Sequence, residues 1–247
     1  MKVLVLGAGG NTGLRLVRTA LAQHHEVTAL ARDEAKLRAA LAVSDGARLT
    51  VRSGDVTDTK MLTAAMEGQD AVINAAGTLT KSEGYVALIA GVIRAADQVL
   101  GKDGRFWFFG GAGVLDVPGT SRMTVDLPLI PKIFRAHREN FETVRKTALD
   151  WSMLCPGPMV DARDGRPHEG LRISADVWPV SRPAATRFLP AMATAIAFAR
   201  KLGEMTITYE DAAHVIVSHL ARGGPFARHR VGVALPPGMR GKKATPF

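Results

Sequence analysis

Three glycines at regular spacing are the residues of this sequence with the clearest chemical use. Gly7, Gly10 and Gly13 follow a short apolar run at positions 3–6, and the apolar residues after Gly13 recur at helical spacing. Gly7 permits a tight turn, Gly10 lets the backbone approach a pyrophosphate, and Gly13 lets the helix pack closely on the strand. A strand, a glycine turn and a helix in this order predict a dinucleotide-binding site rather than a glycine-rich surface turn.

The residues between the second and third glycine stand where donors for the phosphates are needed. Asn11 and Thr12 lie at the predicted start of the helix, where backbone N–H groups are free and the helix dipole is positive. We therefore expect Asn11 and Thr12 to contact the cofactor together with the three glycines.

The second predicted strand ends at Arg32, and Asp33 follows it. This strand end lies beside the adenosine ribose in dinucleotide folds, where a carboxylate binds the 2′-hydroxyl of NAD and an arginine accepts the 2′-phosphate of NADP. Helical residues follow Asp33, so we expect Asp33 to cap the next helix. An arginine–phosphate bond is worth about 1.5–3 kcal/mol, or tenfold and more in cofactor preference. The sequence thus predicts NADP(H), with a solvent-facing Arg32 as the alternative.

Small or polar residues also follow the next three predicted strands. Counted along the chain, these are the third, fourth and fifth strands. We expect the residues after the third strand to face the adenine, those after the fourth to lie beneath the cofactor, and those after the fifth to lie at the nicotinamide end. A helix cap is the alternative role for Asp55, although Asp58 is better placed for it. The candidates are Asp55 and Val56 after the third strand, Ala75, Ala76 and Gly77 after the fourth, and Gly110 and Gly111 after the fifth.

Strand and helix patterns alternate through the first two thirds of the chain. This alternation predicts an α/β fold: a Rossmann-type, doubly wound parallel sheet of six or seven strands in a single domain, 1–247. An irregular substrate-side insertion at 156–205 and a basic tail at 236–247 complete it. Strands are expected at 2–6, 26–30, 48–52, 71–74, 105–109 and 151–155, with helices at 12–22, 33–41, 58–66, 83–100 and 133–148. Beyond them we expect strands at 171–174 and 230–235 and helices at 184–202 and 212–220.

Composition narrows the classes of partner. The net charge is +9, and no acidic residue follows Asp211, but aromatic residues are few near that basic tail and no nucleic-acid motif is present, which disfavours nucleic-acid binding. One cysteine, Cys155, fits a reducing cytoplasm, and no stretch has the uncharged length of a membrane span or the form of a secretory signal. No His, Cys or carboxylate cluster has metal-ligand spacing. The apolar segment 188–199 could be core, a lid over the substrate, or a surface for a homodimer or a protein partner.

The motifs together resemble the short-chain dehydrogenase/reductases. Beyond the glycine turn, the strings Gly110-Gly-Ala-Gly113, Leu149-Asp-Trp-Ser-Met-Leu-Cys-Pro156-Gly157 and Ile207-Thr-Tyr-Glu-Asp211-Ala resemble the atypical, NmrA-like NAD(P)H-binding branch, which includes the biliverdin-IXβ (flavin) reductases. In the main branch of that superfamily a Tyr-x-x-x-Lys pair relays the proton. Here Tyr85 is followed four residues later by Ile89, and Tyr209 by Ala213, which argues against alcohol oxidation and sugar epimerisation.

The resemblance also implies two residues at the nicotinamide end. His137 falls where the family's active-site lysine falls, so it would bond the nicotinamide ribose or donate a proton near neutral pH. The alternative is an exposed histidine in a basic helix. The backbone after Pro156 would pass the nicotinamide, while Cys155 is expected to be a buried apolar residue rather than a nucleophile.

These expectations leave two functions open. The first is an NADPH-dependent reductase that passes hydride to a planar small-molecule acceptor of the flavin, quinone or tetrapyrrole type, with the cofactor supplying the chemistry. The second is a non-catalytic NADP(H)-binding redox sensor that acts through a protein partner. Turnover separates the two.

Overall fold

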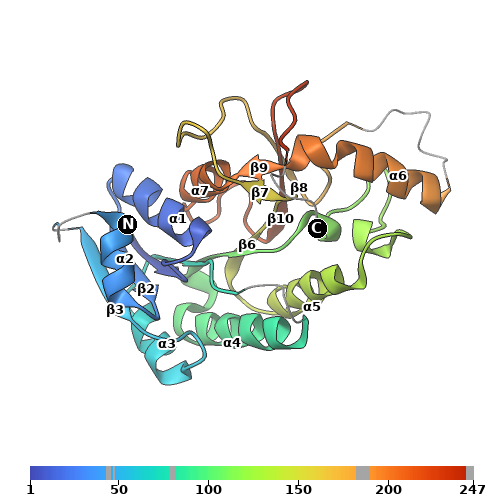
Figure 1. Cartoon of the computed structure of the whole chain (residues 1–247). Helices are drawn as coiled ribbons and strands as arrows, with labels where there is room; N and C mark the ends of the chain where they lie inside the picture. Colours follow the sequence, from blue (N-terminus) through green and yellow to red (C-terminus); the bar gives the residue numbers. More distant parts are fainter. Residues whose placement is uncertain (43–45, 47, 78–81, 182–189, 243–247) are drawn as a thin grey trace.

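A computed structural model describes residues 1–42, 46, 48–77, 82–181 and 190–242. Its centre is an eight-stranded sheet in the order β3-β2-β1-β4-β5-β6-β10-β8, in which all pairs but the last are parallel (Figure 1). The strand order reverses between β1 and β4, which is where an open α/β sheet forms its ligand crevice. The strands are β1 (Lys2–Leu6), β2 (Glu26–Ala31), β3 (Leu49–Ser53), β4 (Ala71–Asn74), β5 (Arg105–Phe109), β6 (Asp150–Cys155), β8 (Arg172–Ala175) and β10 (His229–Ala234).

The predicted Rossmann-type sheet is confirmed, but it has one strand more than expected. The short strand β8 follows no crossover helix and pairs antiparallel with β10, from Val231 opposite Ala175 to Ala234 opposite Arg172. Two further short strands, β7 (Met159–Val160) and β9 (Ile207–Thr208), pair in parallel outside the main sheet. This small sheet holds the loop after β6 next to the start of the last helix.

Two apolar layers sandwich the sheet, because alternate residues of each buried strand point to opposite faces. One layer contains β1 residues Val3 and Val5, and the other contains Leu4 and Leu6. The first layer packs against α1 (Asn11–Ala22), α2 (Glu34–Leu41) and α7 (Tyr209–Val217), and the second against α3 (Thr59–Met66), α4 (Ser82–Leu100) and α5 (Arg135–Val144).

Helix α4 is the one helix of the described residues that is long and apolar enough, by length and composition, to cross a membrane, with a mean hydropathy of 1.2 over Gly84–Asp103. Its apolar side chains are accounted for by packing: Ile89, Val92, Ile93 and Ala96 are buried in the second apolar layer. A core helix of this fold has the same composition for that reason.

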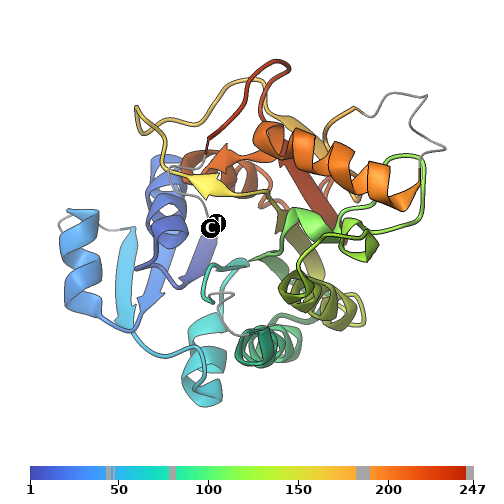
Figure 2. The ribbon, with the colours of Figure 1, turned by 45° about the vertical axis from the view of Figure 1, so that its right-hand side comes forward.

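The chain after β6 is less regular, as expected. Figures 1 and 2 show that these segments, α6 (Ala191–Lys201) included, gather on one side of the molecule. The first residues of the helix expected at 184–202 lie outside the described residues, and α6 begins after Pro190. Its Ala195 and Phe198 join the core, where Phe198 packs on Trp178 with ring centroids 4.8 Å apart. One face of α6 is therefore core, while Met192 and Ile196 stay exposed.

The last helix begins a turn earlier than expected. The hydroxyl of Thr208 accepts a hydrogen bond from the Asp211 amide at 3.0 Å, and the Asp211 carboxylate accepts one from the Thr208 amide at 2.8 Å. This reciprocal capping box starts α7 at Tyr209 rather than at Ala212.

Candidate functional site

The turn after β1 is built so that only glycine fits at two of its positions. Gly7 has a φ of +74°, and a β-carbon there would lie 2.6 Å from the backbone nitrogen of Ala76. A β-carbon on Gly13 would lie 2.2 Å from the carbonyl oxygen of Gly7. Gly10 is looser, since its β-carbon would come no closer than 3.4 Å to that same oxygen. The first and third glycines thus draw β1, α1 and the end of β4 together.

The N-terminus of α1 is left open toward this turn. Gly10 is the N-cap and offers no side-chain acceptor, and the first turn holds no acidic residue. The amides of Asn11 and Thr12 therefore stand at the positive end of the helix dipole, the arrangement that binds phosphate.

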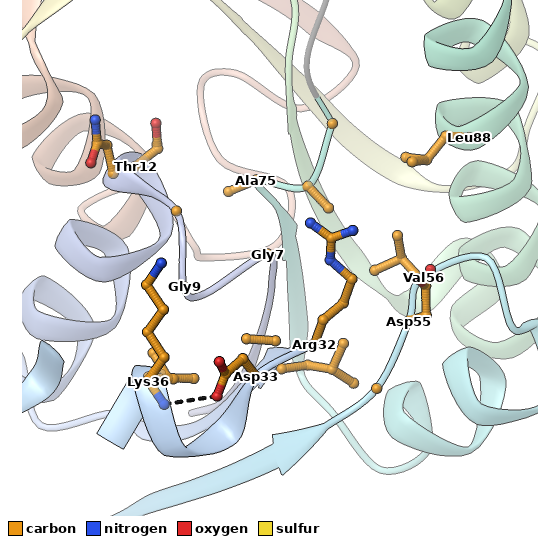
Figure 3. Close-up of a pocket in the computed structure, with 18 of the residues that line it drawn as sticks. Gly7, Gly9, Thr12, Arg32, Asp33, Lys36, Asp55, Val56, Ala75 and Leu88 are labelled. Carbon is orange, nitrogen blue, oxygen red and sulfur yellow. Dashed lines mark hydrogen bonds between the residues drawn. The ribbon is translucent and has the colours of Figure 1, made fainter. Parts of the chain in front are cut away.

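A cavity of about 810 Å³ lies over this turn, at the reversal of strand order between β1 and β4 (Figure 3). Most of the predicted cofactor contacts line it. They are Gly7, Gly10, Asn11, Thr12, Arg32, Asp55, Val56, Ala75, Ala76 and Gly77, while Gly13 packs beneath the turn.

The end of β2 places two cations at the cavity. Arg32 and Lys36 both line it and are both exposed, and within the described residues neither cationic group forms a hydrogen bond or an ion pair. Figure 3 shows the two side chains extending from the end of β2 and the first turn of α2. Asp33 caps α2 through the Lys36 amide at 2.9 Å, as predicted. Asp33 also lines the cavity, so a carboxylate with one oxygen in the helix cap lies beside the two cations.

Asp55 and Val56 line the cavity from the loop after β3. The Asp55 carboxylate accepts hydrogen bonds from the amide and hydroxyl of Thr57 at 2.9 and 2.8 Å. These bonds, the backbone one first, and the charge of Arg32 hold the pKa of Asp55 below its usual range against a small opposing effect of desolvation. Asp58, not Asp55, caps α3, so the alternative role for Asp55 is excluded.

The residues expected at the nicotinamide end lie outside the lining of the cavity. Gly110, Gly111, His137 and Pro156 sit at the ends of β5 and β6 and on α5, and the Pro156 carbonyl accepts the Ala112 amide at 2.8 Å. A β-carbon on Gly111 would lie 3.0 Å from Nε2 of His137. The structure brings His137 to the glycine turn after β5 through this contact.

His137 is a buried histidine. It is 7% exposed, so the alternative of an exposed residue in a basic helix was wrong. Burial lowers the pKa of His137 to about 4, which keeps the imidazole neutral near pH 7. The ring can hold a hydrogen bond there, but it carries no positive charge.

The two tyrosines occupy different environments. Tyr85 is buried against His137, and desolvation raises its pKa to about 12. Tyr209 lines the cavity, with the guanidinium carbon of Arg15 lying 5.6 Å from its ring centre. Neither has a lysine four residues on. Cys155 is fully buried and burial raises the pKa of its thiol, as expected of an inert residue.

Several lining residues were missed by sequence reasoning. Lys36 could have been found from the sequence, because it stands in the first turn of the helix that follows Arg32 and Asp33. No sequence signal placed Met159 and Tyr209 at the cavity, because the pairing of β7 with β9 brings them there from distant segments of the chain. The residues missed are Gly9, Leu30, Ala31, Lys36, Leu37, Gly54, Thr57, Leu88, Met159 and Tyr209. Among the described residues, no group of three His, Cys, Asp or Glu side chains could hold a metal ion.

Comparison with known proteins identifies the class that this fold and cavity define. Residues 7–182 match the model of a family described as NAD(P)H-binding, and the chain belongs to that family. The chain is also 31% identical over 173 residues to the uncharacterized protein YwnB of Bacillus subtilis, covering 65% of this chain and 74% of that protein.

Solved structures share the whole fold. A "putative NADH-flavin reductase" from Streptococcus pneumoniae superposes with a TM-score of 0.68 at 23% identity, covering 95% of this chain and 99% of its own. A short-chain dehydrogenase/reductase from Veillonella parvula, in complex with NADP, gives 0.65 at 17% identity and covers 99% of both chains. At these identities the likeness establishes the fold.

Proposed function

We propose that the protein is an NADPH-dependent reductase that passes hydride to a planar, apolar acceptor of the flavin, quinone or tetrapyrrole type. The observation that carries the cofactor choice is the pair of cations, Arg32 and Lys36, which form no hydrogen bond or ion pair within the described residues, beside Asp33, whose Oδ1 caps α2. A 2′-phosphate would bind both cations, whereas a 2′-hydroxyl would have to share the Asp33 carboxylate with the helix cap.

The residues that line the cavity fit the adenosine and pyrophosphate part of a dinucleotide. Gly7, Gly10 and Gly13 with the open start of α1 would hold the pyrophosphate, and Asp55 and Val56 would bond and cover the adenine. The backbone of Ala75, Ala76 and Gly77 would pass beneath the cofactor. We propose that its nicotinamide half extends toward Gly110, Gly111, His137 and Pro156.

The hydride is supplied by the reduced nicotinamide when it is bound. The protein would orient the cofactor and the acceptor and exclude water from them. In the described part of the chain, no tyrosine–lysine proton relay and no cysteine nucleophile is evident, because neither tyrosine is followed by the lysine that the relay needs and the Cys155 thiol is buried. An acceptor that takes hydride without such a relay is favoured for that reason. The name of the S. pneumoniae relative points to the same class of acceptor.

We place the acceptor on the side formed by residues 156–205, in the one domain that spans 1–247, with 236–247 as a basic tail. The described part of that segment contributes Met159 to the cavity and lies beside Tyr209 of α7. The buried lone cysteine fits a reducing compartment, the cytoplasm.

The test is NADPH oxidation against a panel of flavins, quinones and linear tetrapyrroles, with NADPH binding measured on the same preparation. Turnover that falls in R32A and persists in R94A, a matched loss of an exposed arginine on α4, would support the proposal. Tight NADPH binding without turnover on any acceptor would support the NADP(H) sensor instead.

A further inference from the structure

A cluster of buried polar side chains lies behind the turn that follows β5. Tyr85 comes from α4, and His137 and Asn140 come from α5; all three are less than one tenth exposed. Burial raises the pKa of the Tyr85 hydroxyl and the Asn140 amide lowers it by a smaller amount, but neither end of this amide forms a hydrogen bond of good geometry in the described part of the chain. An apolar set of the same size would stabilise the core more, so this polar cluster points to a purpose other than packing.

The Tyr85 hydroxyl joins the end of β5 to His137. The oxygen lies 3.3 Å from the carbonyl oxygen of Phe109, at the end of β5, and 3.5 Å from Nδ1 of His137. The Tyr85 and His137 rings meet edge to face, with centroids 5.5 Å apart at 85°. A β-carbon on Gly77 would lie 3.0 Å from Cε2 of Tyr85, so the ring sits directly under the cavity wall.

The opposite edge of the His137 ring faces the glycine turn. A β-carbon on Gly111 would lie 2.9 Å from Cδ2 and 3.0 Å from Nε2 of His137, so the missing side chain there is what leaves room for that edge. Phe134 stacks on the ring with an interplanar angle of 12°. These contacts hold Nδ1 toward Tyr85 and Nε2 toward Gly111.

The Tyr85 hydroxyl has one proton and two acceptors within reach, the Phe109 carbonyl at 3.3 Å and Nδ1 of His137 at 3.5 Å. When the hydroxyl donates to Phe109, the shorter contact, its oxygen accepts from His137. That arrangement places the ring proton on Nδ1 and leaves a lone pair on Nε2.

We propose that Tyr85 is a positioning residue: it fixes His137 in the Nδ1–H tautomer, so that Nε2 accepts a hydrogen bond from a hydroxyl group of the bound nucleotide. The inference rests on the proposed function, in which the nicotinamide ribose and its two hydroxyl groups lie at the Gly110–Gly111 turn. It decides between the two roles expected of His137, because an Nε2 without a proton binds a hydroxyl and donates nothing.

The tautomer is measured first, on the full-length protein without ligand. ¹⁵N-histidine NMR at pH 7.5 should show His137, assigned by the signal lost in H137Q, with its proton on Nδ1. In Y85F the His137 signals should move toward the Nε2–H form, because the acceptor for Nδ1–H is gone. His219 is the internal reference: its Nδ1 lies 2.7 Å from the carbonyl of Val215, so its signals should not change. An Nε2–H tautomer in the wild type, or an unchanged His137 in Y85F, would overturn the assignment.

The role toward ligand is measured by affinity for two probes. NADPH carries the nicotinamide ribose, whereas 2′,5′-ADP carries only the adenosine and its phosphates. Loss of one hydrogen bond should weaken NADPH binding by about threefold to tenfold in Y85F and H137Q, while 2′,5′-ADP affinity stays at the wild-type value. Unchanged NADPH affinity in both variants would sink the ligand role. If the wild type bound neither probe, the proposed function would fail. The NMR experiment would still test whether Tyr85 fixes the His137 tautomer, because it needs no ligand.

Discussion

The Asp33 carboxylate accepts a hydrogen bond from the backbone amide of Lys36 at 2.9 Å, and this bond sets the character of the cavity beside it. It fixes the first turn of α2, so that the Lys36 side chain joins Arg32 at the cavity. It also engages Oδ1 of Asp33, the carboxylate beside the two cations in the cavity lining. On the proposed function, the cations and not this carboxylate bind the adenosine ribose end of the cofactor.

Removing either cation should change the preference between cofactors. We expect R32A to weaken NADPH binding by about tenfold or more and K36A by a smaller factor, since an arginine binds phosphate with two N–H groups and a lysine as a point charge. NADH affinity should stay nearly constant in both. Dissociation constants for the two cofactors at one fixed salt concentration provide the measurement.

R94A is the matched control for both variants, because it removes an exposed arginine that does not line the cavity. Its cofactor preference should equal that of the wild type. Equal losses of NADPH affinity in R94A and R32A would show that net charge, not a phosphate contact, governs binding.

The role of Asp33 as a cap predicts a stability effect. D33A should lower the free energy of unfolding by about 1 kcal/mol, whereas D33N, which retains an acceptor oxygen, should lose much less. Urea unfolding of the three proteins gives the values. Because the carboxylate is not proposed to bind ribose, D33N should also keep its preference for NADPH; a shift toward NADH would contradict this assignment.

The central sheet could be predicted because its signals are local. The bounds of β1, β4 and β5 agree with the apolar runs, and within the strand–turn–helix unit Gly7 is required by its positive φ and Gly13 by its contacts with Gly7 and Ala8. The strand expected at 171–174 is found as β8, but its membership of the main sheet was not predicted, because it depends on antiparallel pairing with β10, a tertiary contact.

Among the residues that line the cavity, those that were predicted are placed by local signals, whereas some of those missed are placed by tertiary contacts. Arg32 lies at a strand end, where the fold itself assigns a role, and was predicted. Tyr209 and Met159 reach the cavity only because β7 pairs with β9 across about fifty residues of chain. Burial of His137 could not be predicted either, since the basic residues around it on α5 suggest an exposed helix face.

The geometry of the glycine turn predicts different effects on stability for alanine substitutions at Gly13 and Gly9. G13A should lower the free energy of unfolding by about 1–3 kcal/mol, because its β-carbon would lie 2.2 Å from the Gly7 carbonyl and 2.7 Å from the Ala8 α-carbon, both backbone atoms. G9A should unfold like the wild type, since its nearest contact is the Ala31 β-carbon at 3.5 Å. Thermal and urea unfolding check both; equal stability of the two variants would show that α1 can move away from β1.

The buried imidazole of His137 predicts how stability depends on pH. Burial lowers its pKa to about 4, below the 6.5 of an unfolded chain, so the folded state binds fewer protons than the unfolded state between these values. The contribution of the neutral His137 to the free energy of unfolding is therefore fully present above pH 6.5 and is lost as the pH falls toward 4. The free energy of unfolding of the wild type relative to H137Q should therefore fall by up to about 3 kcal/mol between pH 7 and pH 4. Desolvation and, to a smaller extent, the N-terminal charge also lower the pKa of His25. Because His25 is present in both proteins, its contribution cancels in the difference between the two free energies of unfolding. Urea unfolding at half-unit pH steps gives the two curves. Parallel curves would show that His137 gains a proton freely in the folded protein, and that the ring is not held neutral against the glycine turn.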